Sequence, residues 1–203
     1  MNISIQALKR YGNLQKQRLV DIVDPSLRFV RELQFSDRPV YQVERNNQKS
    51  VLKVFDKNTS FSKTHLQREA SLLKTLEDVE SITHLVHDYG TVFYQNTAIS
   101  SLSFTAILKE YAEGESLQDL RQEDFTACLQ YQVANLITEF HNRGIFDFDI
   151  KRTNFIVSPD FDKITLIDLG KYFLEKELPP EEIKLKRSID YRNFERMLNP
   201  NVY

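Results

Sequence analysis

The chain has 203 residues, of which 41% are hydrophobic and 28% charged, and its 27 basic and 29 acidic side chains leave a formal charge of -2. This composition is typical of a globular protein and argues against nucleic acid as the main partner. The longest apolar runs are far shorter than the ~20 residues that a membrane-spanning helix needs. The start of the chain lacks the apolar core of a secretory signal, so we expect a cytoplasmic protein.

The first half of the chain is predicted to be rich in strands. Residues 1–30 are weakly patterned and are interpreted as a short helix or an arm. The runs PVYQVE and VLKVF flank Asn46-Asn47 and predict a hairpin with a tight turn. Residues 63–78 follow helical spacing, with a capping-box pattern at Thr64 and Gln67. The runs LVHDYGTVFYQ and SFTAILKEY predict two more strands, followed by a polar turn around a glycine.

The second half is predicted to be mainly helical. The run SLQDLRQEDF looks like a short helix, and residues 127–144 predict a longer one that ends at Gly144. The lone Cys128 excludes an internal disulfide, and we expect it to be packed within that helix. NFIVS and KITLIDLG predict two short strands around a Pro-Asp turn. The charged residues 179–198 predict one or two solvent-exposed helices that begin at proline.

Several polar residues are spaced as a phosphate-transfer site requires. Transfer from a nucleotide needs cations for the phosphates, oxygen ligands for magnesium, and a carboxylate near the acceptor hydroxyl. Lys53 lies in the middle of a predicted strand, and Glu69 follows in a helix that we expect to pack against that sheet. Asn154 follows Asp149 by five residues, and Asp168 ends a second strand. Because Mg²⁺ prefers hard oxygen ligands, Asn154 and Asp168 are candidates for a shared metal site.

In order and spacing, these segments resemble the protein-kinase-like superfamily over about residues 35–170. VLKVF resembles the family's Val-Ala-Ile-Lys strand, QREASLL its glutamate-bearing helix, and ILKEYAEGESL its hinge. DFDIKRTNF resembles the His-Arg-Asp-Leu-Lys-x-x-Asn loop, and IDLG resembles Asp-Phe-Gly. The resemblance implies an α+β, bilobal, protein-kinase-like fold. Residues 1–112 would form an N-lobe, with an arm, a five-stranded antiparallel sheet and one helix, and residues 113–203 a truncated helical C-lobe.

For the nucleotide, the resemblance implies ATP bound between the lobes. Lys53 would bind the α- and β-phosphates with Glu69 as its partner, and the backbone of Glu110 and Ala112 would contact the adenine edge. The loop that covers the phosphates contains no glycine, unlike the family's. Arg38 in that loop would either contact phosphate directly, or the loop would lie farther away and ATP would bind weakly.

For the chemistry, the resemblance implies that Asn154 and Asp168 bind Mg²⁺ and that Asp149 orients the acceptor hydroxyl. Lys151 would neutralise the γ-phosphate as charge moves during transfer. Asp147 stands where the family commonly has histidine. It is interpreted as structural, accepting backbone hydrogen bonds near Asp168.

Two further departures from the family follow from the sequence. Lys109 stands before the hinge glutamate at a normally apolar position, where it would snorkel or contact a ligand. Only 33 residues follow Gly170, so we expect a minimal kinase fold without a long activation segment.

Three functions remain open. The segment after Gly170 is loosely similar to bacterial lipopolysaccharide-core heptose and Kdo kinases, which implies a sugar hydroxyl as acceptor. Basic residues near the start, Lys9, Arg10, Lys16 and Arg18, would then meet anionic lipid at the inner face of the membrane. The second function is a compact Ser/Thr protein kinase of the Bud32, RIO or bacterial effector type, which Lys151 favours. The third is a pseudokinase that binds without turnover. In each case we expect a monomer.

Overall fold

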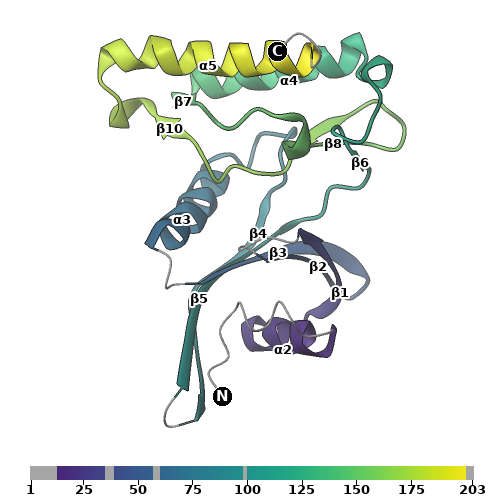
Figure 1. Ribbon diagram of the computed structural model, residues 1–203, viewed down its shortest axis with the longest axis vertical. Helices are drawn as coiled ribbons and strands as arrows, with labels where there is room; N and C mark the ends of the chain where they lie inside the picture. Colours follow the sequence, from purple (N-terminus) through teal and green to yellow (C-terminus); the bar gives the residue numbers. More distant parts are fainter. Residues whose placement is uncertain (1–12, 35–38, 57–59, 98–99, 200–203) are drawn as a thin grey trace. The chain divides into compact units, whose positions relative to one another are not determined.

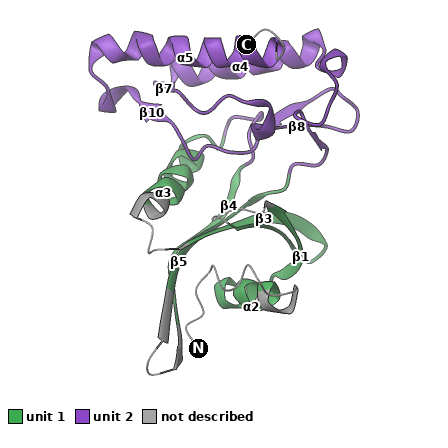
Figure 2. Ribbon diagram, in the orientation of Figure 1, with its two compact units in different colours: residues 1–77, 84–111 green, residues 78–83, 112–203 purple. Residues whose placement is uncertain are grey.

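The computed structural model describes residues 13–34, 39–56, 60–97 and 100–199, and the chain divides into two compact units (Figures 1 and 2). The first unit comprises residues 1–77 and 84–111, and the second comprises residues 78–83 and 112–203. The described part is an α+β protein with a five-stranded antiparallel sheet and four α-helices, which confirms the predicted class.

A short insertion of the second unit interrupts the first. Residues 78–83 lie in the predicted first domain, yet they pair with a strand of the second unit. Leu166 donates its N–H to the Ser81 carbonyl at 2.8 Å, and its own carbonyl accepts from the N–H of Thr83 at 3.1 Å. These backbone hydrogen bonds explain why the insertion belongs with the second unit.

The sheet of the first unit has the strand order β1-β2-β3-β5-β4, and every neighbouring pair is antiparallel. The predicted hairpin at Asn46-Asn47 is confirmed, since these residues have φ of 52° and 64°, the left-handed backbone that asparagine tolerates in tight turns. The strands are β1 (Arg28–Gln34), β2 (Val40–Arg45), β3 (Gln48–Asp56), β4 (Leu85–Thr97) and β5 (Ser100–Glu110).

The resemblance implied a fifth strand in this sheet, but the residue pattern did not locate β1, because its first residues fall within the segment interpreted as a helix or an arm. Its pairing with β2 is irregular between Phe29 and Arg31 and again between Glu32 and Gln34. Such bulges shift side chains from one face to the other and break the two-residue alternation that marks a strand. The irregular register therefore accounts for the weak pattern.

Two helices pack on opposite faces of this sheet (Figure 1). Leu19 of α2 (Asn13–Val23) shares a buried cluster with Leu52 and Val54 of β3. This arrangement confirms that the neighbours of Lys53 point to the face away from it.

The second helix, α3 (Ser60–Thr75), covers the opposite face of the sheet. Its residues Leu66 and Ala70 are buried against Phe55 of β3 and Ile107 of β5. The capping box predicted at Thr64 is wrong, because the helix already begins at Ser60.

In the second unit, α4 (Ala127–Asn142) lies beside α5 (Pro180–Leu198), and both helices were predicted (Figure 1). Gly144 follows α4 with a φ of 70°, as expected for the residue after a helix. Cys128 is exposed, so its predicted burial is wrong. The short helix predicted from SLQDLRQEDF is limited to the 3-10 turn η1 (Gln122–Asp124).

Short strands complete the second unit. The predicted hairpin is confirmed as β8 (Phe155–Val157) and β9 (Ile164–Leu166), and β6 (Glu115–Ser116) pairs with the other side of β8. A separate two-stranded ladder joins β7 (Ile145–Phe146) to β10 (Phe173–Leu174). These ladders hold both ends of the loop between β7 and β8 and both ends of the segment between β9 and β10.

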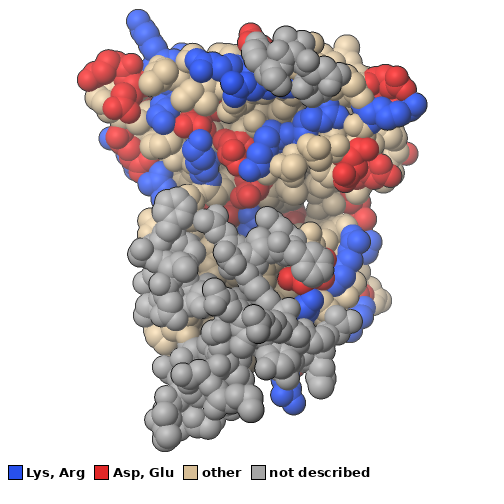
Figure 3. All heavy atoms as spheres, in the orientation of Figure 1, with Lys and Arg blue, Asp and Glu red and all other residues tan. Residues whose placement is uncertain are grey.

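Charged side chains are mixed in sign over the second unit, where Lys and Arg alternate with Asp and Glu on the face shown in Figure 3. Within the described ranges, no helix is long and apolar enough to cross a membrane. Lys16, one of the residues expected to meet lipid, donates to Glu32 at 2.7 Å. Lys9 and Arg10 lie outside the described residues.

We expect Gly114→Ala to destabilise the second unit strongly. Gly114 precedes β6 with a φ of 134°, and a Cβ atom there would lie 1.9 Å from the carbonyl oxygen of Val157. The β6–β8 pairing would have to open, so the free energy of unfolding should fall by about 3 kcal/mol or more. Urea denaturation of the two proteins measures this loss.

Gly90→Ala is the matched control for this substitution. Gly90 also has a positive φ, 59°, but a Cβ atom there would meet nothing within 4 Å. Only backbone strain of about 1 kcal/mol is expected. A loss in Gly114→Ala no larger than in Gly90→Ala would contradict the steric explanation.

Candidate functional site

The first cluster of candidate residues lies on the face of the sheet that α3 covers. Strand β3 carries Lys53, and the middle of α3 carries Glu69. The Lys53 Nζ donates to Glu69 Oε1 at 2.8 Å and to Oε2 at 3.0 Å. The two side chains are only 8% and 1% exposed. The structure therefore joins these two predicted residues in a buried, bidentate ion pair.

A third charged residue joins this pair. The Nζ of Lys109 on β5 donates to Glu69 Oε1 at 2.7 Å, and its side chain is 2% exposed. Lys53 lies opposite Ile107 in the β3–β5 register, so Lys109 is its diagonal neighbour on the same face. In the sequence, Lys109 stood out only as an unusual polar residue. The strand register places Lys109 on the same face of the sheet as Lys53, and this shared face is what links it to Glu69.

The predicted hinge residues lie on either side of the point where the chain passes from the first unit to the second. Glu110 ends β5 in the first unit, and Ala112 belongs to the second. The N–H of Glu110 donates to the carbonyl of His84 at 2.9 Å, and its carboxylate accepts from the N–H of His84 at 3.1 Å. The backbone N–H of Glu110 is therefore already used within the first unit. Arg38 lies outside the described residues.

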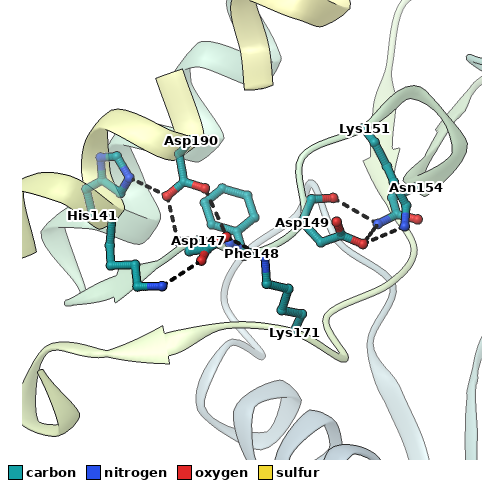
Figure 4. Close-up of polar contacts among 9 residues, drawn as sticks. His141, Asp147, Phe148, Asp149, Lys151, Asn154, Lys171 and Asp190 are labelled. Carbon is teal, nitrogen blue, oxygen red and sulfur yellow. Dashed lines mark hydrogen bonds and ion pairs between the residues drawn. The ribbon is translucent and has the colours of Figure 1, made fainter. Parts of the chain in front are cut away.

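The second cluster lies in the loop between β7 and β8 of the second unit (Figure 4). The Asp149 carboxylate accepts from Lys151 Nζ at 2.6 Å and from Asn154 Nδ2 at 3.3 Å. Asn154 Nδ2 also donates to the Asp149 carbonyl at 2.9 Å. The backbone of Asp149 is left-handed, with a φ of 58°. Two of the predicted residues, Lys151 and Asn154, thus converge on the carboxylate of a third, Asp149.

Arg152 anchors this loop, a role that the sequence analysis missed. It begins the 3-10 turn η2 (Arg152–Asn154) and donates to the carbonyls of Leu117 at 3.1 Å and Leu120 at 2.9 Å. Burial lowers the pKa of its guanidinium group below its ordinary value. Arg152 nevertheless remains a cation at neutral pH and ties the loop to the segment that follows β6.

Asp168 directly follows Ile167, the residue whose backbone pairs with that of Asn154. The N–H of Ile167 donates to the Asn154 carbonyl at 2.9 Å, directly beside the β8–β9 ladder. The Asp168 carboxylate accepts from the N–H of Gly170 at 3.0 Å, which fixes it in the turn after β9. In the described part of the chain, no three His, Cys, Asp or Glu side chains gather as a metal site. The side-chain amide oxygen of Asn154 and the carboxylate of Asp168 are nevertheless hard donors of the kind that Mg²⁺ takes, with water completing its shell.

Asp147 is the centre of a separate ion-pair network (Figure 4). It is buried, and its backbone is also left-handed, with a φ of 51°. Its carboxylate accepts from Lys171 Nζ at 2.8 Å and from Lys186 Nζ at 3.0 Å. The expected partners, backbone N–H groups near Asp168, are thus replaced by two lysines, of which Lys171 follows Asp168 by three residues. Asp147 links the loop to α5 and to the segment after β9.

The acceptor of backbone hydrogen bonds is Asp190 of α5, which the sequence analysis did not single out. Its carboxylate accepts from the N–H of Asp147 at 2.8 Å and from the N–H of Phe148 at 3.3 Å. It also lies 2.9 Å from His141 Nε2 of α4. Asp190 is 0% exposed, whereas most of α5 is exposed or half-buried, so the predicted solvent-exposed helix carries one buried carboxylate that its sequence did not indicate.

Comparisons of the sequence with models of known protein families and with curated proteins find no match. The function therefore has to be argued from the residues themselves. They form one cluster within each unit: Lys53, Glu69 and Lys109 in the first, and Asp149, Lys151 and Asn154 in the second, where Asp168 follows the residue that pairs with the Asn154 backbone.

Proposed function

We propose that the chain is an ATP-dependent phosphotransferase that moves the γ-phosphate of ATP to a hydroxyl acceptor. The observation that carries the proposal is the convergence of Lys151 and Asn154 on the Asp149 carboxylate, at 2.6 and 3.3 Å. A carboxylate, a cation and a metal-type oxygen donor are the groups that such a transfer needs close together.

In this reaction Asp149 orients the acceptor hydroxyl and takes its proton. The acceptor oxygen forms a bond to the γ-phosphorus, the bond from that phosphorus to the β–γ bridging oxygen breaks, and ADP leaves. Lys151 is half-exposed, so its ammonium group can turn from Asp149 to the transferring group and balance its charge. The buried position of Asn154 and its bonds to Asp149 hold the carboxylate in place.

The oxygen atoms of Asn154 and Asp168 are the groups that would hold Mg²⁺. When bound, the ion supplies positive charge to the phosphates of the nucleotide. Asn154 directly precedes β8 and Asp168 follows β9 by two residues, and the hydrogen bond from the Ile167 N–H to the Asn154 carbonyl holds these two segments together.

The Lys53–Glu69 pair of the first unit supports the same function. A buried ammonium group that a carboxylate holds from both of its oxygens has a defined direction, as a phosphate ligand requires. We assign Lys53 to the α- and β-phosphates, and Glu69 to holding its side chain.

Binding of MgATP tests the proposal. At about 100 times the dissociation constant, MgATP should raise the melting temperature by roughly 5–10 °C. Chelation of the metal with EDTA should remove the shift, and so should Asp168→Ala. The control is Asp160→Ala, in the exposed turn between β8 and β9, which should behave as the wild type. No shift in the wild type at millimolar MgATP, or an undiminished shift in Asp168→Ala, would rule the proposal out.

The class of acceptor is decided by a transfer assay. Radioactive ATP is incubated with the protein and either purified lipopolysaccharide or a generic protein substrate. Label in lipopolysaccharide identifies a sugar hydroxyl as the acceptor, whereas label in protein alone identifies Ser or Thr. If MgATP binds but label appears in neither substrate, and no labelled inorganic phosphate is released by hydrolysis, the protein is a binding module.

A further inference from the structure

Lys109 has no part in the phosphate-transfer chemistry proposed above, yet it is among the most buried charged groups of the first unit. Its side chain is 2% exposed, and its ammonium group lies 2.7 Å from Glu69 Oε1. Removing an ion from water is costly, and an apolar side chain of similar volume is often no worse for stability. A lysine at this position therefore requires an explanation beyond packing.

The geometry around Glu69 shows two ammonium groups on a single carboxylate. Oε1 accepts from both Lys53, at 2.8 Å, and Lys109, at 2.7 Å, whereas Oε2 accepts from Lys53 at 3.0 Å. The lysines reach the carboxylate from neighbouring strands on the same face of the sheet. Because the two ammonium groups repel each other, either one can turn toward an incoming anion at a lower cost in free energy.

We infer that Lys109 is a positioning residue that keeps the Glu69 carboxylate charge-paired and in place while the Lys53 ammonium group engages the phosphates of a nucleotide. The inference rests on the proposed function, which assigns Lys53 to the phosphates. A buried carboxylate that loses part of its pairing is destabilised. With Lys109 at 2.7 Å, Glu69 keeps a cationic partner when Lys53 turns toward phosphate. Lys109 therefore acts through Glu69 and does not touch the ligand.

The first experiment compares a ligand with phosphates and one without. In Lys109→Met, the dissociation constant for MgATP should rise about 10-fold, equivalent to one partly lost charge pairing. Binding of adenosine, followed by ligand-observed NMR, should not change. A parallel loss for adenosine and MgATP would indicate a purely structural role and overturn the inference.

A second background separates positioning from direct phosphate binding. If Lys109 acts through Glu69, adding Lys109→Met to Glu69→Gln should weaken MgATP binding no further. If Lys109 instead contacts phosphate, the same addition should weaken it again by about 10-fold. That second result would overturn the inference while leaving the proposed function intact.

A third experiment needs no ligand, so it applies even if the wild type fails to bind MgATP and the proposed function is wrong. Lys53→Met and Lys109→Met should each unfold at a slightly lower temperature, because the other lysine still pairs with Glu69. The double variant should lose roughly 10 °C more than the sum of the single losses, because Glu69 is then buried without either cation.

The control for these melting experiments is Lys74→Met, at the exposed end of α3, where the ion pair with Asp88 contributes little. Its melting temperature should stay close to that of the wild type. A double variant that does not fold, while both single variants do, counts as the expected greater-than-additive loss. Additive losses would show that the lysines do not substitute for each other at Glu69 and would overturn the inference.

Discussion

Replacing Asp149 with alanine should lower the rate of phosphate transfer by about 10³-fold while leaving MgATP affinity within about threefold of the wild type. The carboxylate is the proposed acceptor of the hydroxyl proton, and its oxygen holds Lys151 at 2.6 Å. The residues assigned to the nucleotide, Lys53 and Glu69, lie on another unit and keep their pairing. Single-turnover transfer of labelled phosphate, together with calorimetric binding of MgATP, measures the two quantities separately.

Asp149→Asn refines this experiment, because asparagine preserves the size and one oxygen but cannot accept the proton. Its transfer rate should be as low as that of Asp149→Ala. Asp160→Ala, in an exposed turn, is the control and should retain the wild-type rate. Activity of Asp149→Ala equal to that of the wild type would refute the assigned role, even if nucleotide binding were as expected.

Asp190→Ala should lower the free energy of unfolding by about 3–5 kcal/mol, because it removes a fully buried carboxylate from its partners. The N–H groups of Asp147 and Phe148 would lose their acceptor, and His141 Nε2 would lose its hydrogen-bond partner. Urea denaturation measures the loss. The same substitution should lower phosphate transfer, since the loop that carries Asp149 begins at these N–H groups.

Two variants of α5 provide the comparison for Asp190→Ala. Glu195→Ala removes an exposed carboxylate from the same helix and should change stability by no more than about 0.5 kcal/mol. Asp190→Asn keeps one oxygen as an acceptor and should lose clearly less than the alanine variant. If Asp190→Ala and Glu195→Ala unfolded at the same urea concentration, the backbone hydrogen bonds would not matter for stability.

Local signals predicted much of the fold. The two-residue alternation of β2 and β3, with asparagines between them, specified a hairpin, and the helical spacing of apolar residues specified α4. Strand β1 was missed because its bulges interrupt that alternation. Cys128 was expected to be buried because it lies near the start of an amphipathic helix, but it faces solvent.

The candidate site was predictable only where a motif holds its residues at short, fixed distances along the chain. Asp149, Lys151 and Asn154 lie within six residues, so one loop conformation brings them together. Asp190 gave no such signal, because it lies among charged residues of α5, and its burial depends on N–H groups more than 40 positions earlier. In the sequence, Lys109 could be recognised only as a lysine at a normally apolar position. The β3–β5 register places it on the same face as Lys53, and there it binds Glu69.

The insertion of residues 78–83 limits how the chain can be divided. The polypeptide passes from one unit to the other three times, after residues 77, 83 and 111. A fragment that begins at Ala112 would lack the Ser81 and Thr83 backbone groups that pair with Leu166. Strand β9 would then present an unprotected edge, which is prone to intermolecular association. A soluble second unit made in isolation should therefore include residues 78–83, supplied as a separate peptide or rejoined ahead of Ala112 through a short linker.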